Sequence, residues 1–310
     1  MTSNVPLNVF VFGAGAVGSV HAYIFQKAGA RVTIAARSNA KVAKEHGLDF
    51  QSEKYGNSVV KFDQVVESPA DDILKGQTFD FVVMCNKAIQ MTPSASEQIA
   101  PIVSRQTTIV IIQNGVGNAD QFRERFPDNV IISAVTWVNA AQPKTGTIVH
   151  KSNEKMEIGV EWSNDLDKQT QQDRLNVFVG MLDKAGSEYL AVDNIQQWRW
   201  KDFLSSSPAA ESTARALCQE MALIARTLGH EVDDDYLESL LTRPDLRQGG
   251  IISSMYTDAM NQRPMEVEVI LQAPLRYAKQ LGLQTPVLET CVAIMTALDI
   301  KFQKHQQQKP

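Results

Sequence analysis

A glycine-rich segment near the N-terminus has the residue types and spacing of a phosphate-binding turn. It directly follows the apolar run 8–12 and consists of Gly13, Ala14, Gly15, Ala16, Val17 and Gly18. In a Gly-x-Gly-x-x-Gly turn the first glycine permits a tight bend and the second lets the backbone approach a pyrophosphate. The third allows the next helix to pack closely on the strand, with its N-terminus facing the phosphates. The segment therefore predicts dinucleotide binding; a glycine-rich turn without a ligand is the alternative.

The end of the next predicted strand distinguishes the two nicotinamide dinucleotides. Enzymes that use NAD usually carry Asp or Glu there, about 20 residues past the glycines, to bind the ribose hydroxyls. In this chain the strand 31–35 is followed by Ala36 and Arg37, so an arginine takes the place of the acid. A guanidinium suits a 2′-phosphate by its charge and its paired donors. The sequence therefore favours NADP(H), with a solvated surface arginine as the alternative.

Two further polar residues follow later apolar runs. Lys87 comes after the run 81–85, and Asn114 comes after the run 108–112 and precedes Gly115. In an open α/β sheet, ligands bind outside the carboxyl ends of the strands, so both side chains are expected near the nucleotide. A surface loop lysine and a turn asparagine are the alternatives.

In the C-terminal half, Glu266 follows Pro264, where the pattern predicts the start of a helix. The helix dipole favours the ionised form of a carboxyl group at that place. An ionised carboxylate is suited to orient a lysine rather than to donate a proton. A helix-start carboxylate without a catalytic role is the alternative.

The elements that must position these residues follow from short apolar runs in the first half of the chain. Runs at 8–12, 31–35, 81–85, 108–112 and 130–134 are bounded by polar or glycine residues, which is typical of buried parallel strands. Helix-like stretches alternate with them and predict an α/β fold with a doubly wound, Rossmann-type parallel sheet. Extended segments over 137–159 are expected to add the last strands to this sheet.

From about Asp193 onward the pattern is helical, with Ser207-Pro208, Pro264 and Pro286 as expected helix starts. We therefore expect two domains, which suits a chain of 310 residues. Residues 1–193 form the NADP-binding Rossmann-type domain, and residues 194–310 form an all-helical substrate and dimerisation domain. Because the sequence does not show which helical faces stay exposed, a homodimer remains open.

The composition excludes several classes of protein. A hydrophobic fraction of 44% and a charged fraction of 21% are ordinary for a soluble enzyme, and no run approaches the roughly 20 apolar residues of a membrane helix. A net charge of −5 without a basic cluster argues against a nucleic-acid partner. Three widely separated cysteines favour a reducing compartment, so the expected location is cytoplasmic. The histidines show no metal-ligand spacing, and we expect no metal.

Taken together, the motifs resemble the ketopantoate reductase (2-dehydropantoate 2-reductase) family over nearly the whole chain. The resemblance is carried, in chain order, by Gly13 to Gly18, Cys85-Asn86-Lys87, Asn114-Gly115-Val116-Gly117-Asn118, Ser253-Ser254-Met255 and Glu266. It implies an enzyme that uses NADPH to reduce the ketone of ketopantoate to pantoate, on the route to pantothenate and coenzyme A.

The resemblance also implies roles for individual residues. Asn114 would lie near the nicotinamide and the substrate, and Lys87 near the cofactor ribose. Ser254 would bind the substrate carboxylate or hydroxyl, with Asp258 supporting the site. Glu266 would hydrogen-bond the substrate and the catalytic lysine.

One segment departs from the family pattern. Members carry the catalytic lysine just after a Trp, followed by two Asn at helical spacing. Here Lys201 follows Trp200 and is the best candidate, but no Asn follows nearby and the Ser207-Pro208 helix start comes early. A lysine at this place would protonate the developing alkoxide. Because the segment is shortened, an NADP-binding protein with weak or lost turnover stays an alternative, as does a reductase of another 2-keto acid.

Overall fold

The computed structural model describes residues 5–199, 211–242 and 254–307, which form two compact units. The first unit extends to Ile195 except for two short segments, Ala88–Gln90 and Asn114–Asn118. These two segments belong to the second unit, together with the chain from Gln196 onward. No described helix is both long and apolar enough to cross a membrane.

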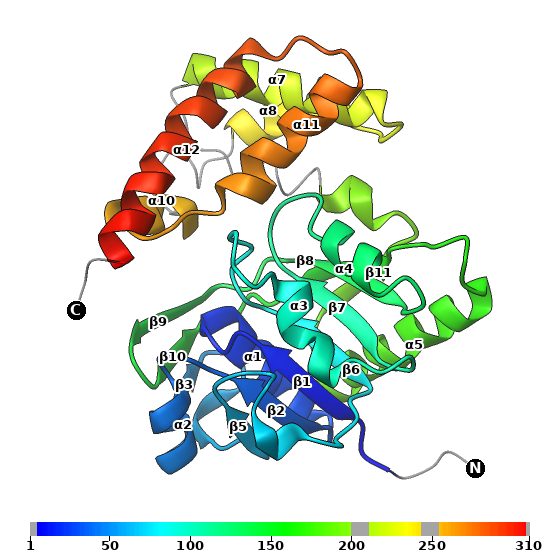
Figure 1. Ribbon diagram of the computed structural model, residues 1–310, viewed down its shortest axis with the longest axis vertical. Helices are drawn as coiled ribbons and strands as arrows, with labels where there is room; N and C mark the ends of the chain where they lie inside the picture. Colours follow the sequence, from blue (N-terminus) through cyan, green and yellow to red (C-terminus); the bar gives the residue numbers. More distant parts are fainter. Residues whose placement is uncertain (1–4, 200–210, 243–253, 308–310) are drawn as a thin grey trace. The chain divides into compact units, whose positions relative to one another are not determined.

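The first unit is built on an eight-stranded sheet (Figure 1). In spatial order its strands are β12 (Tyr189–Ala191), β11 (Met156–Val160), β8 (Ile131–Thr136), β7 (Thr108–Ile112), β6 (Phe81–Met84), β1 (Asn8–Phe12), β2 (Arg31–Ala35) and β5 (Gln64–Val66). The strands from β8 to β5 are parallel, whereas β11 is antiparallel to β8. The chain order reverses between β1 and β6, which is the switch point where ligands bind in doubly wound sheets. The predicted Rossmann-type topology is confirmed.

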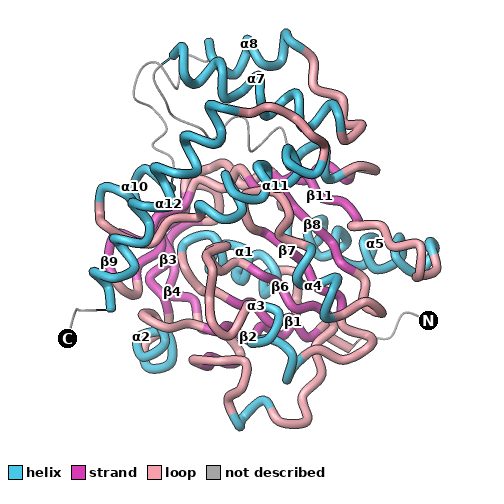
Figure 2. The backbone as a smooth tube through the Cα atoms, turned by 45° about the horizontal axis from the view of Figure 1, so that its top comes forward, coloured by secondary structure: helices cyan, strands magenta, loops and turns pink. Residues whose placement is uncertain are grey.

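Helices cover both faces of this sheet (Figure 2). Successive strand residues point to opposite faces, so each central strand contributes to two cores. Val9 and Val11 of β1 join one buried cluster, and Phe10 joins the other. The first cluster contains side chains of α1 (Ala16–Lys27) and α5 (Lys168–Ala185), and the second contains side chains of α3 (Ala95–Ile99) and α4 (Asp120–Arg125). Short helices complete the connections: α2 (Ala40–Glu45), η1 (Asp72–Leu74) and η2 (Ala100–Ile102).

A second sheet corrects the expectation for residues 137–159. It has the order β4 (Gly56–Val60), β3 (Leu48–Ser52), β10 (Thr147–His150) and β9 (Ala140–Lys144), and it lies against α1. Only β11 extends the main sheet as predicted, because β10 pairs instead with the distant strand β3, in the register Thr147 to Asp49. The expectation of no strand after β11 is also wrong, since β12 pairs with it as an edge strand.

The second unit is helical in its described part, as predicted. Its helices include α7 (Glu211–Thr227), α8 (Asp234–Thr242), α10 (Ser254–Met260), the π-helix η3 (Glu268–Gln272), α11 (Ala273–Gln280) and α12 (Pro286–Gln307). Their apolar faces form one buried cluster. The helix start at Pro286 is confirmed, but the start at Pro264 is wrong by about one turn, because residues 263–266 are not helical and the helix begins after Glu266, whose O accepts the Ile270 N–H at 3.1 Å. The start at Ser207-Pro208 lies outside the described residues.

Candidate active site

The glycine-rich turn lies at the switch point between β1 and β6. Gly13 has a φ of +103°, and both Gly13 N and Ala14 N donate to Ala35 O, at 3.2 and 3.1 Å. A Cβ atom on Gly13 would lie 2.5 Å from Asn86 N in the segment after β6. Only glycine therefore fits at this position, where the turn is held between the ends of the two neighbouring strands.

The other two glycines of the motif have different surroundings. A Cβ atom on Gly18 would lie 2.0 Å from Gly13 O, so this residue sets the close contact between strand end and helix. At Gly15 a Cβ atom would meet no heavy atom of the described residues within 4 Å, its two neighbours in the chain aside. No side chain caps α1 and its first turn, from Ala16 to Gly18, holds no acid. Its first N–H groups thus suit an anion such as a pyrophosphate.

Arg37 and Lys87 follow strands on either side of β1. Phe12 of β1 is in register with Ala35 of β2 and Met84 of β6, so the three strands end at the same edge of the sheet. Arg37 and Lys87 both have exposed side chains just beyond that edge. The structure therefore brings them to the edge where the glycine-rich turn lies.

Two residues that support this edge were not singled out in the sequence. Gln113 Nε2 donates to Asn86 O at 2.8 Å and to Asn86 Oδ1 at 3.0 Å, which joins the ends of β6 and β7. The buried Asn39 donates to Ala14 O at 2.9 Å. Its position before α2 is typical of a helix N-cap, but the structure shows no side-chain cap bond there. Such long-range contacts leave no local signal in a sequence.

In the second unit, Glu266 binds the backbone of one short segment that follows the sheet. Its Oε1 atom accepts the Ala88 N–H at 2.9 Å, and the side chain is buried. The bond holds the chain directly after Lys87. Glu266 thus has a structural contact in addition to any catalytic role.

The segment Asn114–Asn118 is held by three contacts within the second unit. Val116 N donates to Val269 O at 3.3 Å, and Asn118 Nδ2 donates to Asn114 O at 2.9 Å. Arg199 Nη1 donates to Gly115 O at 3.0 Å, with only 1% of the arginine exposed. These contacts fix the backbone of the segment that carries Asn114. Arg199 was not predicted, because a lone arginine beside Trp198 gives no sign of burial.

The other predicted residues have mixed outcomes. Asp258 is buried in α10 and forms an ion pair with Arg263 at 3.1 Å, whereas Ser254 is exposed at the start of the same helix. Lys201 lies outside the described residues. The glycine-rich turn, Arg37 and Lys87 therefore lie in the first unit, whereas Asn114, also expected near the nucleotide, lies in the second unit with Glu266.

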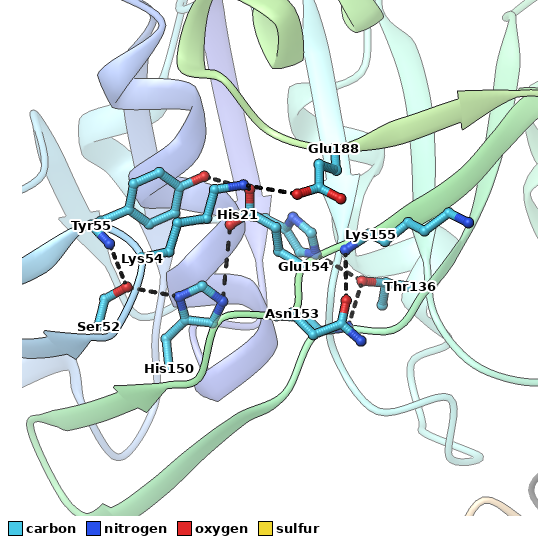
Figure 3. A network of polar contacts seen from close by, with 11 residues as sticks. His21, Ser52, Lys54, Tyr55, Thr136, His150, Asn153, Glu154, Lys155 and Glu188 are labelled. Carbon is cyan, nitrogen blue, oxygen red and sulfur yellow. Dashed lines mark hydrogen bonds and ion pairs between the residues drawn. The ribbon is translucent and has the colours of Figure 1, made fainter.

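A buried polar network that includes His21 of α1 centres on Glu154 (Figure 3). Tyr55 Oη and Lys54 Nζ donate to Glu154 Oε1, at 2.5 and 2.8 Å. His150 Nε2 lies 3.9 Å from Glu154 Oε2, and His150 Nδ1 lies 2.9 Å from Ser52 Oγ. These residues come from the second sheet and its connections, so the network stiffens the layer that covers α1.

His21 brings α1 itself into this network. Burial lowers the pKa of His21 to about 4, although the charge of Glu154 opposes the shift. Burial likewise lowers the pKa of His150 and raises the pKa of Tyr55. A neutral His21 is therefore expected at physiological pH. Within the described residues, no group of three His, Cys, Asp or Glu side chains could hold a metal ion.

Comparisons with known proteins agree with this architecture. The family model described as ketopantoate reductase PanE/ApbA matches residues 9–161, and its C-terminal counterpart matches residues 194–299. A 2-dehydropantoate 2-reductase from Nostoc sp. is 23% identical over 308 residues, which cover 93% of this chain and 94% of the relative.

Two solved structures share the fold. A 2-dehydropantoate 2-reductase from Methylococcus capsulatus has 24% identity and a TM-score of 0.79, covering 96% of this chain and 98% of the other. A D-mandelate dehydrogenase solved with NADH and anilino(oxo)acetate has 19% identity and a TM-score of 0.81, covering 96% and 99%. The two family models span most of the sequence, which confirms the resemblance. The chain belongs to the ketopantoate reductase PanE/ApbA family, and it is an oxidoreductase of this NAD(P)-dependent 2-keto acid reductase family.

Proposed function

We propose that the protein reduces ketopantoate to pantoate with NADPH, as a step of pantothenate and coenzyme A synthesis. The observation that carries the proposal is the N-terminus of α1 at the switch point of the sheet. No side chain caps it, and the space beside Gly15 holds no other atom of the described residues within 4 Å of a Cβ position, its chain neighbours aside. The relative from Nostoc sp. supports ketopantoate as the substrate. The three cysteines form no disulfide, which supports the cytoplasm as the compartment.

The preference for NADPH is proposed on Arg37. Its exposed side chain follows β2 at the edge that carries the glycine-rich turn, and Lys87 follows β6 at the same edge. A guanidinium there can pair with a 2′-phosphate, and Lys87 is assigned to the cofactor ribose. Fluorescence titration of the unaltered protein should give a lower Kd for NADPH than for NADH. Arg37→Asp should narrow or reverse this preference, and equal affinities in the unaltered protein would contradict the assignment.

The chemistry is divided between the two proposed domains, residues 1–193 and 194–310. Bound NADPH supplies the hydride that reduces the ketone carbon. Lys201 Nζ is assigned as the donor of the proton to the ketone oxygen, where negative charge develops, and Glu266 as the group that orients the lysine and the substrate. Ser254 and Asn114 are assigned to substrate binding, with Asp258 in support.

Single-turnover oxidation of NADPH in the presence of ketopantoate tests the assignment of the acid. Lys201→Ala should slow the reaction by about 100-fold or more, the usual contribution of a positioned proton donor, with an unchanged Kd for NADPH. Lys75→Ala is the matched control, because Lys75 is an exposed lysine that pairs with Asp72. An unaltered rate in the Lys201 variant would place the proton donor elsewhere.

A second candidate is the reduction of a different 2-keto acid. The fold matches the D-mandelate dehydrogenase as well as it matches the ketopantoate reductase. A panel that contains ketopantoate and phenylglyoxylate, the keto acid corresponding to mandelate, separates the two by their kcat/KM values. NADPH binding without oxidation on any member of the panel would instead favour a protein that has lost turnover, as the shortened segment after Lys201 allows.

A further inference from the structure

The side-chain amide of Asn39 uses all of its hydrogen-bonding positions in the first unit. Its Nδ2 atom donates to Ala14 O at 2.9 Å and to Gln142 Oε1 at 3.1 Å. Its Oδ1 atom accepts from Gly146 N at 3.0 Å and from Gln142 Nε2 at 2.9 Å. Ala14 O can only accept and Gly146 N can only donate, so the orientation of the Asn39 amide is determined. The side chain is 1% exposed.

Asn39 therefore joins its own turn to two segments that are distant in sequence, the glycine-rich turn and the hairpin of β9 and β10. Ala14 belongs to the glycine-rich turn, Gln142 lies in β9, and Gly146 lies in the turn between β9 and β10. Asn39 itself follows Arg37 by two residues, in a turn that Ala40 N closes by donating to Arg37 O at 3.2 Å. The second sheet thus supports both the turn that suits a pyrophosphate and the turn that carries Arg37.

The bond to Ala14 O also orients the next backbone donor. A peptide unit is planar and trans, so its C=O and N–H groups point in opposite directions. Since Ala14 O points to Asn39, the Gly15 N–H points away from Asn39. Ala14 N is held as well, by Ala35 O at 3.1 Å. Two hydrogen bonds of Ala14 consequently fix the direction of the Gly15 N–H.

We propose that Asn39 is a positioning residue for nucleotide discrimination, because it keeps the Arg37 turn in register with the glycine-rich turn. This inference rests on the proposed binding of NADPH at that edge. Without Asn39 the two turns can shift relative to each other, and the guanidinium then meets the 2′-phosphate less often. NADPH should lose more affinity than NADH, which lacks that phosphate.

Titrations with NADPH, NADH and 2′,5′-ADP test the inference on the full chain. Asn39→Asp keeps the size and the acceptor atoms of the side chain but loses the donor to Ala14 O. Asn39→Ala removes the contacts without adding a charge. In both variants the Kd for NADPH and for 2′,5′-ADP should rise about five- to tenfold, the factor expected for one lost hydrogen bond, and the Kd for NADH should rise less. In turnover, KM for NADPH should rise while kcat changes little.

Asn129→Ala is the matched control. Asn129 is also buried and donates to two carbonyl groups, Ser104 O at 2.7 Å and Thr107 O at 2.8 Å. These lie before the start of β7, at the opposite edge of the sheet from the glycine-rich turn. This variant should lose stability without any change in the ratio of the two Kd values.

A combination with Arg37→Ala shows whether Asn39 acts through the guanidinium. In the Arg37→Ala background, adding Asn39→Ala should not change the ratio of the Kd values for NADPH and NADH any further. An unchanged ratio in both single Asn39 variants overturns the inference, as does an equal loss in the Asn129 variant. If the unaltered protein binds NADPH in an Arg37-dependent manner, such a result leaves the proposed function intact. An unaltered protein that does not bind NADPH overturns both.

Discussion

Replacement of Gly15 by alanine should separate nucleotide binding from folding. Gly15 has a φ of −80° and a ψ of −163°, an extended conformation that alanine adopts without strain. The added methyl group would lie within 4 Å of no heavy atom of the described residues, the two residues next to Gly15 aside. It would, however, occupy the space through which a pyrophosphate must approach the first N–H groups of α1.

The size of both effects follows from this geometry. The free energy of unfolding should change by less than about 1 kcal/mol. Alanine is less favourable than glycine at the N-cap position of a helix, but it also lowers the entropy of the unfolded chain, and the two effects oppose each other. Displacing the pyrophosphate from one N–H group removes a hydrogen bond to a charged group, worth about 1.5–3 kcal/mol. The Kd for NADPH should therefore rise by roughly 10- to 150-fold.

Gly18→Ala is the informative comparison. Its methyl group would lie 2.0 Å from Gly13 O, so backbone must move and the variant should lose at least about 1–3 kcal/mol of stability. Isothermal titration with NADPH and urea unfolding, both at pH 7.5, should show weak binding with normal stability for Gly15→Ala. They should show reduced stability for Gly18→Ala. Unaltered NADPH affinity in the Gly15 variant would refute the placement of the pyrophosphate at this helix.

Two further predictions concern buried groups. Glu266→Gln keeps an acceptor for the Ala88 N–H, so it should retain stability while NADPH oxidation slows; Glu266→Ala should also lose about 1–3 kcal/mol of unfolding free energy. Full activity of Glu266→Gln would reduce this residue to a structural contact. Because burial lowers the pKa of His21 to about 4, the unfolded chain binds a proton below pH 6.5 that the folded protein binds only near pH 4. From this residue the free energy of unfolding should fall by about 3 kcal/mol as the pH drops from 6.5 to 4. His21→Phe should reduce that slope in urea unfolding, and an unchanged slope would assign it to other groups.

The parts of the fold that the sequence predicts are those encoded over short distances. The strand β1, the turn at Gly13 and the helix α1 adjoin one another along the chain, so apolar runs and glycine spacing suffice to identify them. Arg37 is recognised in the same way, by its place directly after the next strand. Family-specific motifs add the reaction class, because they carry residue types as well as periodicity.

The tertiary structure alone decided which distant segments meet. The second sheet exists because β10 pairs with β3, and neither strand's own residues specify that partner. The contacts of Asn39 with Ala14 and of Glu266 with Ala88 likewise join residues that are far apart in the sequence. Hydrogen bonds between such segments form only when folding brings the segments together, so local sequence patterns do not predict them. The residue types able to bind a nucleotide could thus be identified from the sequence, whereas the contacts that hold them in place could be identified only from the folded chain.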